Sequence, residues 1–283
     1  MSGQHHTSAA DVLEAPAGDG RARGQLRALL TAVMFLTRIP CPRWVGFHPD
    51  LLARSTPYFP LVGLVVGAWG GAVFWAASRG WSAGVAAVCA TAATVWLTGA
   101  FHEDALADSC DGFGGGWGKD QILAIMKDSR VGSYGVVGLA LALAAKLAAL
   151  VGIAAADGVA GVAQALVAAH VLGRWSSLPL IWHYPYVRED APGAAAAKSR
   201  PFAASVTPAR LAAGSALAVA IVAAALGARG ALALLVAAAV TALAGRYFRR
   251  RIGGITGDCL GAANQMVELA VYLALAFRWA GAR

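Results

Sequence analysis

The sequence predicts an all-α fold: a polytopic integral membrane helical bundle of about seven transmembrane helices, preceded by an N-terminal interfacial or re-entrant helix. The first reason is composition, because 58% of the 283 residues are hydrophobic, only 13% are charged, and the mean hydropathy is +0.61. Soluble domains carry roughly a quarter charged residues. The second reason is a series of apolar runs near the roughly 20 residues that a helix needs to cross a bilayer. Alanine and glycine dominate these runs, which favours close packing between helices.

The chain begins with a polar segment. Residues 1–24 are rich in Ala, Gly, Asp, Arg and His and contain no apolar run, so we expect a disordered tail and no signal peptide. Residues 25–283 are predicted to form a single membrane-embedded domain. Its first element, residues 25–40, is apolar but short, and Arg27 and Arg38 bracket it. Pro40 and Pro42 are expected to end this helix.

Seven segments that follow are apolar enough to be candidate transmembrane helices. They cover about 58–78, 82–101, 132–155, 159–182, 211–227, 230–247 and 260–279.

Basic residues are distributed unequally between the two sides of this predicted topology. Of the 23 Lys and Arg residues, Arg79, Arg229, Arg278 and Arg283 fall on one side, and Lys146 and Arg174 lie within spans. All the others fall on the side of the N-terminus and of the long polar loops. Because cytoplasmic loops carry an excess of Lys and Arg, that side is predicted to be cytoplasmic. The net charge of +8 is therefore attributed to membrane orientation and not to nucleic-acid binding.

The most informative segment is F-H-E-D-A-L-A-D-S-C-D-G-F, residues 101–113, which holds four of the chain's 15 acidic residues. Asp104, Asp108 and Asp111 are spaced i, i+4, i+7 and therefore share one face of a helix. Like charges on one face repel one another, so the arrangement favours a bound cation, and carboxylate oxygens suit Mg²⁺ or Mn²⁺. The alternative is a solvated helix end.

A second group of polar residues belongs to the predicted spans. Lys146 and Arg174 lie in apolar segments, where a charge costs roughly 2.5–3.5 kcal/mol on insertion scales and usually faces a partner inside the protein. His170 shares a helix face with Arg174. Near the start of the last span, Asp258 is either a helix cap or a functional acid, and Glu268 is a buried acid that needs a cation or a hydrogen-bonding partner.

Two loops could contact substrate. Lys127 and Arg130 lie just after the acidic segment, where they either bind phosphate or simply flank the membrane on its basic side. The loop of residues 182–202 carries aromatic, basic, Pro and Gly residues and is either a substrate lid or an ordinary connection. Cys41, Cys89, Cys110 and Cys259 show no spacing of a disulfide framework or a zinc site. Carboxylates that hold a divalent ion beside Arg and Lys indicate metal-assisted phosphoryl or diphosphate transfer at a membrane surface.

Five motifs, in order and spacing, resemble the cobalamin synthase family, whose members are adenosylcobinamide-GDP ribazoletransferases. They are T-R-I-P (37–40), Y-F-P-L-V-G (58–63), T-G-A-F-H-E-D-A-L-A-D-S-C-D-G-F (98–113), M-K-D-S-R-V-G-S-Y-G (126–135) and G-G-I-T-G-D-C-L-G-A (253–262). The resemblance runs from about residue 26 to the end of the chain.

This resemblance implies the last assembly step of vitamin B12. There α-ribazole, or its 5′-phosphate, displaces GMP from adenosylcobinamide-GDP with Mg²⁺ at the inner membrane. It implies Asp104, Asp108, Asp111 and Glu268 as metal ligands. Lys127, Arg130, Lys146 and Arg174 are predicted from their own charge and position to bind substrate. The predicted catalytic residues are His102, Asp104 and Asp258, with His102 or Asp258 as base. The chain departs from the family pattern at Ala105, where Gly is expected, and at Gln265, where Glu is expected.

Two alternatives remain, one an enzyme of the same chemical class and one a protein of a different class. A membrane prenyltransferase or a CDP-alcohol phosphotransferase also uses Asp-rich helices with Mg²⁺, but the latter expects D-G-x-x-A-R where this chain has D-G-F-G-G-G. A divalent-cation transporter is disfavoured because the chain has no internal repeat and its acids lie at the predicted cytoplasmic face. The expected partners are the two substrates and the lipid bilayer, and no nucleic acid is expected. The sequence leaves open whether a second copy of the chain joins in a homo-oligomer.

Overall fold

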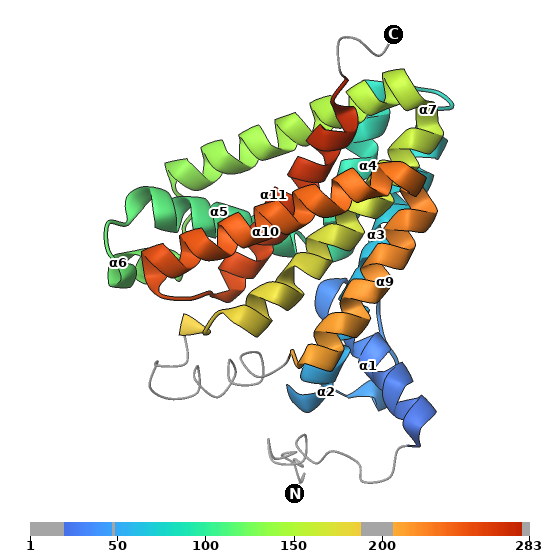
Figure 1. The fold of residues 1–283 in the computed structure, drawn as a ribbon. Helices are drawn as coiled ribbons and strands as arrows, with labels where there is room; N and C mark the ends of the chain where they lie inside the picture. Colours follow the sequence, from blue (N-terminus) through green and yellow to red (C-terminus); the bar gives the residue numbers. More distant parts are fainter. Residues whose placement is uncertain (1–19, 47–48, 188–205, 279–283) are drawn as a thin grey trace, which may run out of the picture.

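The computed structural model describes residues 20–46, 49–187 and 206–278, and within them every regular element is a helix (Figure 1). The predicted all-α class is thereby confirmed. The α-helices are α1 (Arg21–Leu36), α2 (Pro49–Ser55), α3 (Phe59–Ala77), α4 (Ala83–Thr98), α5 (Phe101–Gly115), α6 (Lys119–Ile125), α7 (Ser133–His183), α9 (Pro208–Leu226), α10 (Gly230–Ile252) and α11 (Gly257–Ala276). Short 3₁₀ turns, η2 (Arg43–Val45), η3 (Thr56–Tyr58) and η5 (Gly227–Arg229), join some of them.

The N-terminal helix differs from its expected bounds. The predicted tail falls mostly outside the described residues, but α1 begins at Arg21, inside the segment predicted to be disordered. The helix ends at Leu36, before Pro40, because Thr37 adopts an extended conformation. Backbone groups there find partners outside the helix: the Arg38 amide donates to the Leu97 carbonyl at 2.8 Å.

Four helical stretches are long and apolar enough to cross a membrane, or five if the bent pair α4–α5 is one span. Two of these stretches, Ser133–His183 and Pro208–Ile252, each contain two of the predicted spans. In α7 the division lies at Gly158, whose φ of 67° and ψ of −167° are not helical. Figure 1 shows the chain reversing at the corresponding end of α7, so its two halves run back along the bundle.

Small residues allow the helices to approach closely, as their abundance predicts. The long helix α7 makes its most extensive contacts with α3 and α11. On α3, a Cβ added at Gly63 would meet the His170 backbone at 2.4–2.7 Å, and one at Gly67 would meet the Val167 Cα at 2.6 Å. Any larger residue at these positions would push α3 away from α7.

The two ends of the bundle differ. At one end lie α5, α6 and the last turn of α10 (Figure 1). At the other end Asp157, beside the break in α7, accepts from Arg229 at 3.0 Å and from Arg278 at 2.6 Å. These ion pairs join the corner of α7, the connection between α9 and α10, and the end of α11.

Candidate active site between α5 and α11

A sharp bend in the chain creates the acidic helix. The axes of α4 and α5 differ by 91°, whereas the sequence predicts an apolar span that continues to residue 101. Gly99 and Ala100 both have left-handed backbone conformations, with φ of 72° and 59°. A Cβ on Gly99 would also collide with the Arg38 guanidinium. Such a φ is uncommon for Ala, so the surrounding packing must hold this turn. The result is that α5 lies across the bundle.

The second motif begins α11, which packs directly on α5. Thr256 caps α11 by accepting a hydrogen bond from the Cys259 amide at 3.2 Å. Asp258 is therefore not the cap; it lies half-buried in the first turn. A Cβ added at Gly261 would meet the Ala105 Cβ, so the two helices touch here. Ala105 stands where the family pattern has Gly, and its methyl group fits because residue 261 has no side chain.

A buried charge cluster lies at the centre of the bundle. Glu268 on α11 is 1% exposed and contacts Lys146 Nζ, His170 Nδ1 and Arg174 Nη1, each at 2.8 Å. All three nitrogen groups come from α7, two from its second half. Lys146 and Arg174 were predicted to have a partner inside the protein, and the carboxylate of Glu268 is that partner for both. A buried carboxylate with several donors is stable in an apolar core, whereas an isolated charge would be very costly there.

The cluster extends toward α5 through Gln265. Lys146 Nζ donates to Gln265 Oε1, and Gln265 Nε2 donates to Glu103 Oε1 at 3.1 Å. Glu103 is buried, and its second oxygen, Oε2, has no partner among the described residues. An amide at 265 can donate to one neighbour and accept from the other, which a Glu carboxylate could not do. Sequence reasoning missed this bridge because it treated Gln265 only as a departure from the family pattern.

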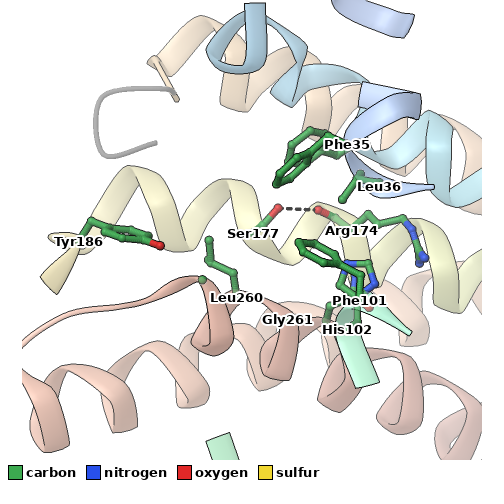
Figure 2. A pocket seen from close by; sticks show the side chains of 12 residues that line it. Phe35, Leu36, Phe101, His102, Arg174, Ser177, Tyr186, Leu260 and Gly261 are labelled. Atoms are coloured by element: carbon green, nitrogen blue, oxygen red, sulfur yellow. Dashed lines mark hydrogen bonds between the residues drawn. The ribbon is translucent and has the colours of Figure 1, made fainter. Parts of the chain in front are cut away.

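A cavity of about 240 Å³ opens beside the cluster (Figure 2). Its walls are largely apolar and aromatic. Its lining includes the polar residues His102 on α5, Arg174 on α7 and Asn264 on α11, all at most 5% exposed. The full lining is Phe35, Leu36, Phe59, Phe101, His102, Arg174, Ser177, Tyr186, Gly257, Leu260, Gly261 and Asn264. His102, predicted as a catalytic residue, therefore faces a space that a ligand could enter.

The three aspartates of α5 have different surroundings. Asp104 is exposed, Asp108 is half-buried and Asp111 is buried. Asp111 accepts from the Gly132 amide at 2.7 Å and from the Gly135 amide at 2.8 Å, at the N-terminus of α7. A carboxylate suits this position because the first amides of a helix lack partners within it and carry partial positive charge. Asp111 thus joins two helices.

These contacts bear on the predicted metal ligands. Within the described ranges, no group of three or more His, Cys, Asp or Glu side chains is placed to hold a metal ion. Asp111 is occupied by two amides and Glu268 by three nitrogen groups, so their predicted role as ligands finds no support in these contacts. Asp104 has no partner in the described part of the chain, and Asp108 lies one turn further along the same face.

The predicted phosphate-binding residues of the loop after α6 lie at the surface. Lys127 and Arg130 are exposed. Arg130 pairs with Asp128 at 2.6 Å, and its guanidinium lowers the pKa of the Asp128 carboxyl to about 2. Neither basic residue lines the cavity. The loop of residues 182–202, predicted as either a substrate lid or an ordinary connection, is described only as far as Val187, and its Tyr186 lines the cavity.

Arg251 fixes the glycine-rich end of α5, and its role could not be read from the sequence. Its guanidinium donates to the carbonyls of Phe113 at 3.3 Å and Gly116 at 2.9 Å and lies 5.8 Å from the centre of the Phe113 ring. In the sequence, Arg251 is one of several basic residues at the end of α10. Their charge indicates only the orientation of the chain in the membrane.

Together, these observations define an all-helical protein with four or five candidate membrane spans, a buried charge cluster and an adjoining cavity. The chain belongs to the cobalamin-5-phosphate synthase family, whose sequence profile matches residues 28–276. The resemblance drawn from the five motifs is thereby confirmed.

Several curated relatives are similar over most of their length. An adenosylcobinamide-GDP ribazoletransferase of Leptothrix cholodnii is 45% identical over 88% of this chain and 94% of the relative. Proteins with the same name from Ralstonia nicotianae and Shewanella frigidimarina are 44% and 42% identical over 88% and 89% of this chain, and each is covered over 94% of its length. No solved structure matches the chain.

Proposed function

We propose that this protein is an adenosylcobinamide-GDP ribazoletransferase that performs the final assembly step of cobalamin biosynthesis. It joins adenosylcobinamide-GDP to α-ribazole, or to α-ribazole 5′-phosphate, and releases GMP. The observation that carries the proposal is the agreement with relatives of this name along almost the whole chain. The geometry is consistent with it, because the acidic motif on α5 and the motif that begins α11 pack against each other beside one cavity.

In the proposed reaction a ribazole hydroxyl attacks the phosphorus atom next to the cobinamide side of the diphosphate. A new P–O bond forms, the bond to the GMP oxygen breaks, and the hydroxyl proton passes to a base. His102, on the cavity wall, and Asp258, in the first turn of α11, are the candidate bases. Lys127 and Arg130 are proposed to steady the departing GMP phosphate, since Lys and Arg both bind phosphate oxygens.

We propose that Asp104 and Asp108 hold a Mg²⁺ ion, with Mn²⁺ as a possible substitute. Mg²⁺ commonly uses only one or two protein carboxylates and takes its other ligands from water and substrate phosphates. Two carboxylates one turn apart on α5 fit that requirement, and Asp104 has no competing partner among the described residues. When bound, the ion would neutralise negative charge that builds up on the diphosphate.

For Asp111 and Glu268 we propose supporting roles. Asp111 fixes the start of α7 relative to α5, and Glu268 fixes the cations of α7 relative to α11. Both carboxylates thus set the positions of the helices on which the substrate-binding groups stand, including Arg174 at the cavity.

For the membrane arrangement, we propose seven spans in the bacterial inner membrane, with the active site at the cytoplasmic side. The break at Gly158 and the turn at Gly227 divide the two longest helical stretches into two spans each. The excess of basic residues near α5, α6 and the end of α10 supports a cytoplasmic position for that end.

The test is direct. Purified protein is incubated with adenosylcobinamide-GDP, α-ribazole and Mg²⁺, and GMP is measured. We expect stoichiometric GMP and a corrinoid product that depends on both substrates, and loss of both after chelation. GMP release without any dependence on α-ribazole would contradict the proposed transfer and leave a hydrolase.

A further inference from the structure

The cavity between α5 and α11 has a composition that restricts what can fill it. Its volume of about 240 Å³ is slightly below the roughly 300–1,000 Å³ of pockets that enclose a whole drug-sized ligand. It can therefore take one compact group of a substrate, such as a bicyclic aromatic base, and not a corrin ring.

The walls of the cavity favour a flat aromatic group. Phe35 stacks on Phe59, with ring centres 6.1 Å apart, and meets Phe101 edge-on, with ring centres 5.5 Å apart. Tyr186 lies at the other end of the cavity (Figure 2). Aromatic rings that line a cavity stabilise a bound base through stacking and edge contacts.

The polar residues that line the cavity are few, and two of them have a side-chain atom without a partner among the described residues. Arg174 is 2% exposed and its Nε has no hydrogen-bond partner among the described residues, although its Nη1 binds Glu268. Asn264 is 3% exposed and its Oδ1 is likewise without a partner there. Buried polar atoms are nearly always paired, so residues of the cavity wall carry one donor and one acceptor for which the described residues supply no partner.

We propose that this cavity binds the benzimidazole base of the ribazole substrate; the inference rests on the proposed function. A benzimidazole riboside has one free ring nitrogen, which only accepts a hydrogen bond and so matches Arg174 Nε–H. A ribose hydroxyl donates to Asn264 Oδ1. The two methyl groups of the base contact apolar lining such as Leu36 and Leu260.

The guanine of the other substrate fits less well. Its edges carry two donor nitrogens and several acceptors, and the cavity offers few polar groups to meet them. Unpaired polar groups in a buried site reduce affinity strongly. A lipid acyl chain would fill the volume but would leave Arg174 Nε and Asn264 Oδ1 unpaired.

The test compares the two substrates in steady-state kinetics of GMP release. Leu260→Phe places a larger side chain in the cavity and is compared with Leu51→Phe, at a residue of α2 that is equally 8% exposed and does not line the cavity. We expect Leu260→Phe to raise KM for α-ribazole about tenfold or more, with KM for adenosylcobinamide-GDP changed less than about threefold. Leu51→Phe should leave both KM values unchanged.

Two further measurements keep the inference testable if Leu260→Phe does not fold. Phe101 is 45% exposed and forms part of the aromatic wall of the cavity. Phe101→Leu removes this ring and should raise KM for α-ribazole about fivefold or more. For the unaltered enzyme, the riboside of benzimidazole without its methyl groups should have a KM about tenfold higher than α-ribazole.

The opposite pattern would overturn the assignment. If Leu260→Phe and Phe101→Leu raise KM for adenosylcobinamide-GDP and not for α-ribazole, the cavity binds the nucleotide. If they alter neither KM, the cavity binds no substrate base. In both cases the enzyme still forms GMP from both substrates, so the proposed function survives. Failure of the unaltered enzyme to form GMP would instead contradict the function itself.

Discussion

Glu268 Oε2 and Lys146 Nζ lie 2.8 Å apart although 122 positions separate them in the sequence, and both residues are at most 5% exposed. The pair joins α11 to the first half of α7, while Arg174 and His170 bind the other oxygen of Glu268 from the second half. One carboxylate thus holds three helical segments together and also orients Arg174 at the cavity.

The first prediction follows from this convergence. Glu268→Gln removes the only carboxylate that contacts Lys146, His170 and Arg174 in the described part of the chain, and leaves buried cations without an anion. Removing one partner of a buried ion pair typically costs about 3–5 kcal/mol. We expect Glu268→Gln to lower thermal stability in detergent far more than Lys146→Met, because Glu268 keeps two donors in the latter variant. Equal stability of the two variants would contradict the proposed central role of Glu268.

The second prediction separates a capping role of Asp111 from metal binding. Asp111→Ala leaves the amides of Gly132 and Gly135 without their acceptor, so thermal stability should fall by the equivalent of about 1–2 kcal/mol. The Mg²⁺ concentration that gives half-maximal activity should stay within about twofold of the original value. A large increase in that concentration, with unchanged stability, would restore Asp111 as a metal ligand.

The third prediction concerns the bend that turns α5 across the bundle. Gly99→Ala introduces a side chain at a positive φ and against the Arg38 guanidinium, so it should destabilise the protein by about 1 kcal/mol or more. Gly80→Ala is the matched control, because nothing lies within 4 Å of its added Cβ. Thermal unfolding of the two variants measures the difference, and equal melting temperatures would show that the bend tolerates a side chain.

Particular residues show how far the sequence could predict this structure. Apolar runs identify the helices, and the i, i+4, i+7 spacing correctly places Asp104, Asp108 and Asp111 on one helix. The same spacing cannot show that Asp111 turns to the amides before α7, since those amides become neighbours only after the helices pack. The 91° bend at Gly99–Ala100 was missed because it depends on an Ala held at positive φ.

Similar reasoning applies to the charge cluster. A charged residue in an apolar span predicts an interior partner, and that expectation was met for Lys146, Arg174 and Glu268. Which residues pair could not be predicted, because their separations of 94 to 122 positions carry no local signal. The contact between Gln265 and Glu103 was not predicted for the same reason, because their hydrogen bond forms only where α5 and α11 meet.

The fourth prediction concerns topology. Lys119, at the start of α6, lies at the end of the bundle that is proposed to be cytoplasmic. Lys119→Cys should react with a membrane-impermeant thiol reagent only when the cytoplasmic side is open, and Arg229→Cys, at the opposite end, should react only from outside. Both are introduced after the native cysteines are replaced. Labelling of residue 119 from outside intact cells would reverse the proposed orientation.

The most direct test of the central claim is GMP release by Asp104→Asn beside Asp120→Asn. The first change removes one charge from the proposed metal site, and the second removes an exposed acid of α6 outside it. Both proteins should be extracted in normal yield, because an amide is no harder to insert into a membrane than a carboxylate. We predict that Asp104→Asn lowers the rate of GMP release about a hundredfold or more, while Asp120→Asn retains nearly full activity. Equal rates for the two variants would show that α5 does not hold the catalytic metal.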